Sequence, residues 1–255
     1  MISILLSCYN SNFEYLKEQI DSIIRQTEPD LELLVYNDGT NELKPFIEKY
    51  KDKRIKYFDE GHIGYAKAYN YLLNKATGKY ICFCDHDDIW VDEKLAVEKG
   101  YLDNHPEVDC VFGFLHWFGE KEKIEKFEIT DKDISRELPF WQPIKNATTM
   151  FRKSRFGEQD SPLQQCGDYW FWSKHWDRHY HLMPYILVHY RRHAGEMTKD
   201  KTAFREQTAL IIQRNMAIFG LNFTLDTCKA LDRYSKTYDK ALKEFVQDNI
   251  EELKW

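Results

Sequence analysis

The sequence predicts an α/β fold with a mostly parallel central sheet flanked by helices, followed by a helical extension at the C-terminus. Within residues 1–90, four apolar strand-like segments alternate with three segments of helical periodicity. Strands and helices that alternate through short connections are typical of a parallel sheet covered by helices. Each of the four strands also runs directly into a polar loop. Because such sheets bind ligands outside the carboxyl ends of their strands, these loops form the expected site.

The elements of the first half follow from apolar periodicity and from the polar turns between them. Branched and aromatic residues predict strands at residues 2–7, 31–36, 55–58 and 80–84. Helical spacing of apolar residues predicts helices at residues 15–26, 42–51 and 65–76. The turn after the first strand contains serine and asparagine residues that can cap the following helix. The loops that follow the four strands are residues 8–12, 37–40, 59–64 and 85–88.

The second half alternates less clearly. Apolar runs predict strands at residues 110–117, 144–151 and 185–189, and helical spacing predicts helices at residues 92–103, 169–175, 203–219 and 226–255. The charged segment 119–137 is expected to form an exposed hairpin or loop. We therefore expect one domain at residues 1–200, with halves at 1–90 and 91–200, and an extension at 201–255. Mixed charge on the last helices predicts that they cover the sheet domain rather than bind a membrane or a partner.

Composition narrows the class of protein. The chain has 255 residues, of which 43% are hydrophobic and 31% charged, as in soluble globular proteins. A net charge of −6 disfavours nucleic-acid binding, which needs a basic face. No apolar stretch reaches the roughly 20 residues of a membrane span, and the N-terminus lacks the pattern of a signal peptide. Six cysteines without metal or redox spacing are expected to be reduced, which predicts a cytoplasmic protein, with peripheral membrane association left open.

An acidic cluster ends the strand at residues 80–84. Asp85, Asp87 and Asp88 place three carboxylates within four positions, where they repel one another unless a positive charge lies among them. Carboxylate oxygens are preferred ligands of hard divalent cations, which can bridge substrate phosphates. The alternative is a solvated, aspartate-rich turn, which is common after a strand. The cluster alone leaves both interpretations open.

Five short strings in residues 1–90 occur in the order and at the spacings of a known family. They are Ser7-Cys-Tyr-Asn10, Asn37-Asp-Gly-Thr40, Gly64-Tyr-Ala-Lys-Ala-Tyr-Asn70, Gly78-Lys-Tyr80 and Asp85-His-Asp-Asp88. Together they resemble the family 2 glycosyltransferases of the GT-A fold, whose strings are close to P-x-Y-N, D-D-G-S, G-x-x-x-A-R-N, G-x-Y and D-x-D-D. Each string alone is weak, so the resemblance depends on their succession.

The resemblance implies a fold, a reaction and a set of partners. The fold is GT-A, with a Rossmann-like nucleotide-binding half at residues 1–90 and an acceptor half at 91–200. The reaction is an inverting transfer of a sugar from a UDP- or dTDP-linked donor to a glycan or a lipid-linked saccharide. Mn²⁺ or Mg²⁺ is the implied cofactor, and no nucleic acid takes part. Assembly of bacterial surface polysaccharide is the expected setting.

The resemblance also assigns the donor and the metal to particular residues. Asp38 is expected to recognise the nucleobase, because Asn37 replaces the first acid of that string, and Tyr9 is expected to pack on the base. Tyr69 stands where the string has arginine, so Lys67 is an alternative source of positive charge. The expected donor residues are Ser7, Tyr9, Asn10, Asp38, Gly64, Lys67, Asn70, Asp85 and His86. The expected metal ligands are Asp85, Asp87 and His193.

The resemblance places the catalytic base at Asp168. The family has a glutamate–aspartate pair that opens a helix, and here Gly167 stands in place of the glutamate. Asp168 precedes an apolar helical segment, so its carboxylate is expected at a helix N-terminus. The alternative is that Asp168 is only the N-cap of that helix, which is a common role for aspartate.

A basic string after the last expected strand supplies further candidates. Residues 190–198 resemble a string close to Y-R-x-H-x-x-N-x-T or S, found in many bacterial members. His193 is expected to complete the metal shell or contact the diphosphate, although a lone histidine in a basic loop is as often exposed or hydrogen-bonded. Candidates for contact with the diphosphate or the acceptor are Arg191, Arg192, Asp88 and Trp90.

Two other functions compete with glycosyl transfer. A nucleotidyltransferase also joins a nucleotide to metal-binding carboxylates, but it predicts a glycine-rich, basic phosphate loop after the first strand. Residues 7–11 have neither feature, which disfavours it. The second alternative is a nucleotide-sugar- or carbohydrate-binding module that has lost its catalytic base. Gly167 in place of the glutamate keeps that alternative open.

Overall fold

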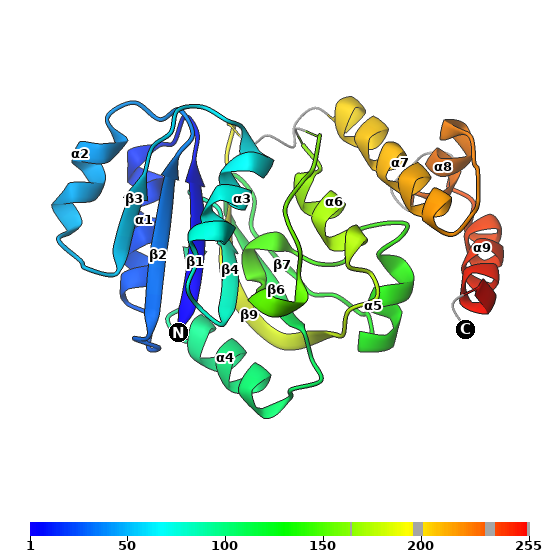
Figure 1. Ribbon diagram of the computed structural model, residues 1–255, viewed down its shortest axis with the longest axis horizontal. Coiled ribbons are helices and arrows are strands. Elements are labelled where there is room, and N and C mark those ends of the chain that lie inside the picture. The colour runs from blue at the N-terminus through cyan, green and yellow to red at the C-terminus, as the bar shows by residue number, and fades with distance from the viewer. Residues whose placement is uncertain (164, 196–200, 233–237, 254–255) are drawn as a thin grey trace. The chain divides into compact units, whose positions relative to one another are not determined.

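The computed structural model describes residues 1–163, 165–195, 201–232 and 238–253 (Figure 1). The chain divides into two compact units. Unit 1 comprises Met1–Glu128, Ile144–Asp160 and Arg178–Ala194, and unit 2 comprises Ile129–Pro143, Ser161–Asp177 and Gly195–Trp255. The expected extension at 201–255 thus shares a compact unit with residues 129–143, 161–177 and 195–200 of the expected domain at 1–200. The division into a donor half and an acceptor half remains a prediction.

Unit 1 contains a nine-stranded sheet within the described residues. Its strands are β1 (Ile2–Cys8), β2 (Leu31–Asn37), β3 (Ile55–Phe58), β4 (Tyr80–Cys84), β5 (Ile89–Trp90), β6 (Cys110–Gly119), β7 (Lys123–Glu125), β8 (Met150–Arg152) and β9 (Tyr180–Arg192). Their order is β3-β2-β1-β4-β8-β6-β9-β5, and β7 pairs with β6. The predicted α/β class with a mostly parallel sheet is confirmed, because β1 pairs in parallel with β2 and β4, β2 with β3, and β6 with β9.

Strand direction places the carboxyl ends of β4, β6 and β9 at one edge of the sheet. The short strand β8 is antiparallel to both β4 and β6, so β4 and β6 run in the same direction. β9 is parallel to β6, and β5 is antiparallel to β9. The loop at residues 85–88 and the ends of β6 and β9 therefore share the edge where the predicted site lies.

Four α-helices accompany the described strands of unit 1 and lie on both faces of the sheet (Figure 1). They are α1 (Phe13–Ile24), α2 (Leu43–Ile47, continued by a 3₁₀ turn at Glu48–Tyr50), α3 (Tyr65–Lys75) and α4 (Lys94–Asn104). Leu6 of β1 joins Leu16 and Ile20 of α1 in one buried core. On the opposite face, Tyr69 of α3 packs on Phe83 of β4 at 5.1 Å between ring centroids. Each side of the central strands is therefore apolar, as their continuous hydrophobic runs predict.

The polar turn after β1 starts α1 as the sequence predicts. Asn12 is the N-cap, and its side-chain oxygen accepts hydrogen bonds from the backbone N–H groups of Glu14 at 2.8 Å and Tyr15 at 3.3 Å. The six cysteines are buried and carry free thiols, as predicted. In the described part of the chain, no helix has the length and apolar character needed to cross a membrane.

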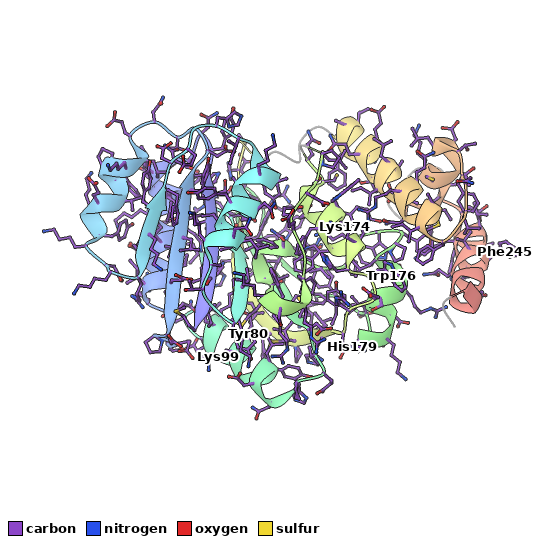
Figure 2. All side chains as sticks on the ribbon, viewed as in Figure 1. Tyr80, Lys99, Lys174, Trp176, His179 and Phe245 are labelled. Atoms are coloured by element: carbon purple, nitrogen blue, oxygen red, sulfur yellow. The ribbon has the colours of Figure 1, made fainter. Side chains whose placement is uncertain are left out.

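Unit 2 is helical in its described residues. It contains α5 (Asp131–Glu137), α6 (Gly167–Lys174), α7 (Lys201–Ile218), α8 (Leu225–Leu231) and α9 (Lys240–Leu253). Trp141 packs with Ile212 of α7 and Val246 of α9 in a separate buried core. Glu137 of α5 forms a partly buried ion pair with Lys243 of α9. Phe245 of α9 projects from the unit with 65% of its surface exposed (Figure 2).

The predicted elements of the second half need correction. The start of segment 119–137 forms a hairpin as predicted, since β7 pairs with β6. The segment then ends in helix α5, which buries Ile134 completely and so is not an exposed loop. Residues 144–151 form a 3₁₀ turn and the short strand β8 rather than one strand. The strand expected at 185–189 extends over β9. The helix expected at 226–255 appears as α8 and α9, and residues 233–237, 254 and 255 lie outside the described residues.

Gly113 allows β6 and β9 to pair despite an irregular register. The register shifts on either side of Phe114. A Cβ atom on Gly113 would lie 2.6 Å from Leu187 Cδ1 and 2.8 Å from the carbonyl oxygen of Tyr185, closer than packing allows. Glycine therefore permits the close approach that the irregularity requires.

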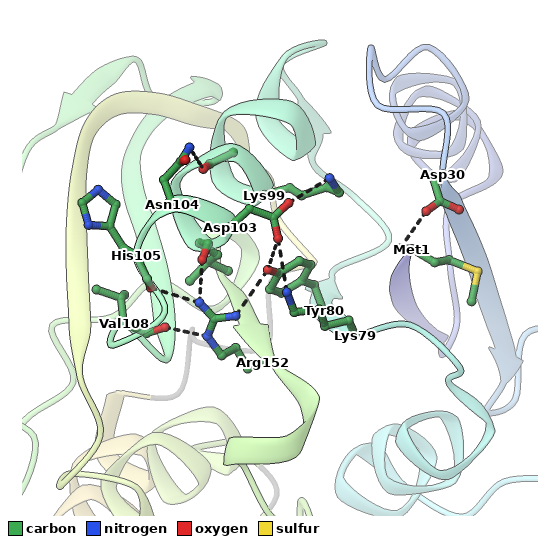
Figure 3. A network of polar contacts seen from close by, with 12 residues as sticks. Met1, Asp30, Lys79, Tyr80, Lys99, Asp103, Asn104, His105, Val108 and Arg152 are labelled. Atoms are coloured by element: carbon green, nitrogen blue, oxygen red, sulfur yellow. Dashed lines mark hydrogen bonds and ion pairs between the residues drawn. The ribbon is translucent and has the colours of Figure 1, made fainter.

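Arg152, the last residue of β8, caps the C-terminal end of α4 (Figure 3). Its guanidinium donates hydrogen bonds to the carbonyl oxygens of Leu102 at 2.6 Å, His105 at 3.0 Å and Val108 at 2.8 Å. Carbonyl groups at a helix C-terminus lack partners within the helix, and a cation there is favourable. Arg152 also donates to the hydroxyl of Tyr80 on β4 at 3.3 Å, which ties the helix end to the sheet.

Glu32 forms a buried polar network between β2 and the start of β4. Its carboxylate accepts hydrogen bonds from the Ser3 hydroxyl at 2.5 Å and from the backbone and hydroxyl of Thr77 at 2.7 and 2.8 Å. Lys56 Nζ lies 2.6 Å from the second carboxylate oxygen. Burial alone would raise the pKa of Glu32, but the hydrogen bonds from Lys56, Ser3 and Thr77 outweigh it and lower the pKa to about 2.

This network predicts a pH-dependent contribution to stability. Because the folded pKa lies below the ordinary value of 4.5, the contribution is present above that pH and is lost as the pH falls toward about 2. Glu32→Gln should therefore lower the free energy of unfolding at pH 7 by up to about 3 kcal/mol. Urea unfolding at pH 7 and pH 3 would measure this, with the exposed Glu48→Gln as the control. Equal pH dependence in wild type and Glu32→Gln would contradict the prediction.

Candidate active site

The polar loops after β1 and β2 are joined by hydrogen bonds. The backbone N–H of Asp38 donates to the carbonyl oxygen of Cys8 at 2.8 Å, and that of Ser11 donates to the Thr40 hydroxyl at 3.2 Å. The Asn37 side chain accepts from the backbone N–H of Thr40 at 2.8 Å. The two loops therefore form one surface at the carboxyl edge of the sheet.

Asp38 connects this surface to the loop after β3. Its buried Oδ1 accepts hydrogen bonds from the backbone N–H groups of Ile63 at 2.7 Å and Gly64 at 2.9 Å, and it lies 3.1 Å from His62 Nδ1. The Tyr9 ring stacks on His62 at 5.0 Å between centroids and is half exposed. Tyr9 and His62 thus present an aromatic surface beside Asp38, and the expected contact of Asp38 with a base remains a prediction.

The other expected donor residues lie near the same edge with different exposure. Asn10 is exposed in a left-handed conformation with φ of 46°, and Gly64 precedes α3 with φ of 86°. Asn70 on α3 accepts a hydrogen bond from the backbone N–H of Gln159 at 3.2 Å. Ser7 is half-buried at the end of β1, and Lys67 is exposed on α3. Their contacts with a donor remain predictions.

Tyr69, which stands where the family string has arginine, is a core residue in this structure. Its ring is 2% exposed, and its hydroxyl donates to the carbonyl oxygen of Cys84 at 2.8 Å. Cys84 is the last residue of β4, directly before the acidic loop. A core contact under that loop therefore replaces a charged side chain.

Asp88 lies under the acidic loop rather than on its surface. Its carboxyl group is fully buried, Oδ1 accepts from the backbone N–H of Arg191 at 2.9 Å, and Oδ2 has no hydrogen-bond partner. Burial raises the pKa of Asp88 well above its usual range, and the carboxylates of Asp87 and Asp85 raise it further. The expected contact of Asp88 with diphosphate or acceptor is thus corrected, because this side chain links the loop to β9.

Asp87 and His193, two of the expected metal ligands, lie next to each other, and their role as ligands remains a prediction. Asp87 Oδ2 lies 2.9 Å from His193 Nε2, and both side chains are about one-fifth exposed, at 23% and 21%. The two residues are far apart in the sequence and come together because β9 ends beside the loop after β4. The His193 ring also lies 5.3 Å from that of Tyr15 on α1. Residues 196–198 of the basic string lie outside the described residues.

The acidic loop carries side chains of the types that bind divalent cations. Asp87 and His193 are partly exposed beside each other, whereas the carboxyl group of Asp88 is fully buried beneath them. Oxygen and imidazole ligands suit Mn²⁺ and Mg²⁺. Among the described residues, no group of three or more histidine, cysteine, aspartate or glutamate side chains is arranged so that it could hold a metal ion. Phosphate oxygens commonly complete such sites.

His86 adds a neutral side chain to the same loop. Its imidazole is largely buried, and Nδ1 has no hydrogen-bond partner in the described structure. Burial lowers the pKa of His86, while the Asp87 carboxylate acts in the opposite direction. The expected donor contact of His86 remains a prediction.

Arg191 positions the loop instead of presenting a free guanidinium. Its Nε donates to the carbonyl oxygen of Asp87 at 2.8 Å, and its guanidinium pairs with Glu18 of α1. The guanidinium also lies over the rings of Tyr15 at 4.2 Å and Phe118 at 4.5 Å. The expectation that Arg191 contacts phosphate is therefore wrong for this conformation. The Arg191 side chain is 12% exposed, and its guanidinium is already paired with Glu18.

Trp90 also needs correction. Its side chain is 1% exposed in the core of unit 1, so it does not contact diphosphate or acceptor in this structure. Lys94 Nζ lies 4.2 Å from its ring centroid and 2.7 Å from a carboxylate oxygen of Glu98, with both charged side chains fully buried. Burial raises the pKa of Glu98 to about 7, although Lys94 opposes this. Trp90 is therefore a core residue whose polar neighbours were not evident from the sequence.

Asp168 lies in the first turn of α6, in unit 2. Its Oδ1 accepts from the backbone N–H of Tyr169 at 2.8 Å, and its Oδ2 accepts from the Gln142 amide at 3.0 Å. The N-cap position belongs to Cys166, so Asp168 is not the N-cap that the alternative interpretation requires. A half-buried carboxylate held at two oxygens is a suitable candidate base.

Comparison with known proteins decides the family. Residues 3–164 match the family model described as Glycosyl transferase family 2. The chain belongs to glycosyl transferase family 2. The matched region includes the five strings and the acidic loop, which agrees with the resemblance seen in the sequence.

Relatives in glycosyl transferase family 2 come from bacteria and archaea. An uncharacterised glycosyltransferase of Haemophilus influenzae is 30% identical over 249 residues, covering 87% of this chain and 75% of the relative. One from Methanocaldococcus jannaschii is 31% identical over 183 residues, covering 68% of this chain but only 63% of the relative. The Escherichia coli protein WfgD, named a UDP-Glc:alpha-D-GlcNAc-diphosphoundecaprenol beta-1,3-glucosyltransferase, is 26% identical over 174 residues, 68% of each chain.

Solved structures share the fold. Staphylococcus aureus TarS 1-349 in complex with UDP-GlcNAc superposes with a TM-score of 0.68 at 18% identity, covering 96% of this chain and 78% of TarS. A mannosyltransferase of Pyrobaculum calidifontis in complex with GDP-Man and Mn²⁺ gives a TM-score of 0.60 at 14% identity, covering 99% of this chain and 73% of that one. These similarities confirm the GT-A fold, with helices at the C-terminus.

Proposed function

We propose that this chain is an inverting, metal-dependent glycosyltransferase that moves a sugar from a nucleotide donor to a saccharide hydroxyl. The observation that carries the proposal is the contact of Asp87 with His193 at the carboxyl end of β4 in a family 2 domain. Sequence strings far apart in the chain contribute to this one group of side chains. An aspartate-rich turn of purely structural function would not require the histidine that follows β9 beside it.

For the donor, we propose a uridine nucleotide, with a thymidine nucleotide as the alternative. Tyr9 and His62 offer an exposed aromatic surface on which a base can stack. The names of WfgD and the TarS complex refer to UDP-sugars, which supports the same class. We assign binding of the nucleoside to groups near Asp38, Gly64 and Asn10.

For the cofactor, we propose that Asp87 and His193, with Asp85, hold Mn²⁺ or Mg²⁺. When bound, the cation would neutralise charge on the departing nucleoside diphosphate. Asp88 and Arg191 act beneath the loop, because their hydrogen bonds join residues 87 and 88 to β9. Their contribution is to hold the Asp87 backbone at a constant position.

For the chemical step, we propose that Asp168 takes the proton from the acceptor hydroxyl as that oxygen attacks the anomeric carbon. Hydrogen bonds from Gln142 and from the Tyr169 N–H orient the carboxylate. The new carbon–oxygen bond forms opposite the bond to the diphosphate, so one direct displacement inverts the anomeric configuration. Positioning of the two substrates supplies much of the rate, because the nucleoside diphosphate is already a good leaving group.

For the setting, we propose surface polysaccharide assembly at the cytoplasmic face of the membrane, with peripheral association. The name of WfgD, which includes a diphosphoundecaprenol-linked acceptor, supports this setting. The alternative is a binding module without catalysis, which Gly167 in place of the glutamate keeps open. The two are distinguished by turnover, since both predict donor binding.

A thermal-shift panel tests the proposed donor and cofactor. We expect UDP-glucose or UDP-GlcNAc with Mn²⁺ to raise the unfolding temperature by about 5–10 °C at a hundred times Kd, because a ligand of the folded state adds about 2.7 kcal/mol. Omission of Mn²⁺ should remove most of the shift. GDP-mannose and dTDP-glucose serve as comparison donors. A shift with GDP-mannose alone would contradict the base assignment, and no shift with any nucleotide would contradict the function.

A further inference from the structure

Several cations gather around one indole ring at the end of β6. We define the basic aromatic face as Trp117, Lys121, Lys123, Tyr190 and Arg192. Trp117 and Tyr190 lie on the paired strands β6 and β9, and Lys123 lies opposite Trp117 on β7. All five residues belong to unit 1.

The cations of the basic aromatic face lie close to the Trp117 ring. The Arg192 guanidinium is 4.4 Å from the ring centroid, Lys123 Nζ is 5.1 Å away and Lys121 Nζ is 5.3 Å away. Tyr190 lies 6.3 Å from Trp117 between centroids and 5.9 Å from the Arg192 guanidinium. Attraction between each cation and the indole offsets part of the repulsion among the three charges.

One carboxylate contacts this face and is shared with a fourth cation. Glu125 Oε2 accepts a hydrogen bond from Trp117 Nε1 at 2.9 Å, while Glu125 Oε1 lies 3.5 Å from Lys145 Nζ. In the part of the chain that the structure describes, neither Lys121 nor Lys123 forms an ion pair with a carboxylate. The face is therefore positive in a chain whose net charge is −6.

The hairpin places more cations than acids on the side of Trp117. Trp117 contacts Lys121 and Lys123, whereas the preceding residue of β6, His116, points to the other side and lies 3.5 Å from Glu122. Glu125 is the acid on the side of the indole. With Arg192, that side carries three cations and this one carboxylate, which favours the binding of an anion there.

The basic aromatic face lies at the edge of the sheet that carries the acidic loop. β6 and β9 end at the same edge as β4, and Arg191, next to Arg192, binds Asp88 through its backbone. Aromatic rings beside cations suit a sugar that carries a phosphate, because the apolar face of the sugar packs on a ring and the phosphate accepts from lysine and arginine.

We propose that the basic aromatic face binds a phosphate or diphosphate group carried by the saccharide acceptor. The inference rests on the proposed function, and it narrows the acceptor to an anionic class. The donor diphosphate is assigned elsewhere, to Asp87 and His193, so the two phosphate sites are separable by mutation.

Calorimetric titration with two synthetic probes tests the proposal. The anionic probe is GlcNAc linked through a diphosphate to a short alkyl chain, and the neutral probe is the corresponding alkyl glycoside of GlcNAc. Wild type should bind the anionic probe at least about tenfold more tightly, and this preference should shrink at high salt. Lys121→Glu and Lys123→Glu should each lower the affinity for the anionic probe by about five- to tenfold. The affinity for the neutral probe should stay within about twofold of the wild-type value.

The matched control is Lys126→Glu, the same charge change at an exposed lysine of the same segment that makes no contact with Trp117. It should leave both probes unchanged. The UDP thermal shift with Mn²⁺, measured on the same variants, should equal that of wild type; a wild type that binds no UDP would instead refute the proposed function.

Three outcomes would overturn the proposal. One is equal affinity of wild type for the two probes. Another is a fall in affinity for the anionic probe in Lys126→Glu that is as large as the fall in Lys123→Glu. The third concerns vesicles of phosphatidylglycerol in phosphatidylcholine. If wild type binds such vesicles, and Lys121→Glu and Lys123→Glu no longer bind them but still bind the anionic probe, the basic aromatic face binds a membrane rather than the acceptor.

Discussion

Asp168→Asn is expected to lower the turnover of acceptor glycosylation by about 10²–10⁴-fold, the usual contribution of a general base. Asparagine has nearly the same shape and can still accept from Gln142 or the Tyr169 N–H, so the fold of α6 should persist. What it loses is the capacity to take the hydroxyl proton. The KM for the donor should change little, because donor binding is assigned to unit 1.

Steady-state kinetics with a saturating UDP-sugar would measure this effect. Asp226→Asn, an exposed carboxylate on α8 with 92% of its side chain accessible, is the control and should retain full turnover. Equal turnover in Asp168→Asn and wild type would remove Asp168 from the mechanism. A wild type that binds UDP-sugar with Mn²⁺ but transfers nothing to any acceptor would favour the binding module.

Asp87→Asn should lower turnover by about 10²–10³-fold, as expected when a group that stabilises the developing charge is lost. The substitution removes the negative charge that favours a cation and weakens the contact with His193. We also expect nucleotide affinity in this variant to become nearly independent of Mn²⁺. The fold should persist, because Asp87 is partly exposed and Arg191 bonds to its backbone carbonyl rather than to its side chain.

Titration of UDP binding at increasing Mn²⁺ concentration would check the second prediction. Asp92→Asn, a half-exposed carboxylate that follows the acidic loop, controls for the charge change and should behave as wild type. If Asp87→Asn retained the full gain in UDP affinity with Mn²⁺, the cation would have to bind elsewhere.

The first half of the fold could be predicted because its signals are local. The strands Ile2–Cys8 and Tyr80–Cys84 are short and mostly apolar, and the first helix between them begins at a clear cap, Asn12. The meeting of Asp87 and His193 was also predictable, although only through the resemblance of two separate strings to one family. Pairing of β9 with β6 and β5, which produces the contact, was not evident in the sequence.

Burial of individual polar and aromatic residues was not predictable. Asp88 and Trp90 follow the exposed part of one loop, yet both are buried because β5 turns back to pair with β9. Arg191 looked like a phosphate ligand until its contacts with Glu18 and the Asp87 backbone were known. In each case the decisive partner lies far away in the sequence, so charge and residue type alone could not decide.

Some functional candidates were missed altogether. His62 carries a weak local signal, since it lies between two glycines in the loop after β3, but its stacking on Tyr9 depends on β1 and β3 ending at one edge. The basic aromatic face has a local signal in the alternating charges of residues 120–128. The sequence indicates only an exposed hairpin or loop there, because the position of Trp117 relative to the lysines follows from the pairing of β6 with β7.

We propose that a metal-chelated diphosphate binds at the carboxyl edge of the sheet, beside Asp87 and His193. Anomalous diffraction from crystals grown with Mn²⁺ and UDP would test it most directly. We predict an anomalous peak within coordinating distance of an Asp87 carboxylate oxygen, with the diphosphate against the peak and the base near Tyr9. A well-ordered UDP bound elsewhere, with no manganese peak beside Asp87, would contradict the account.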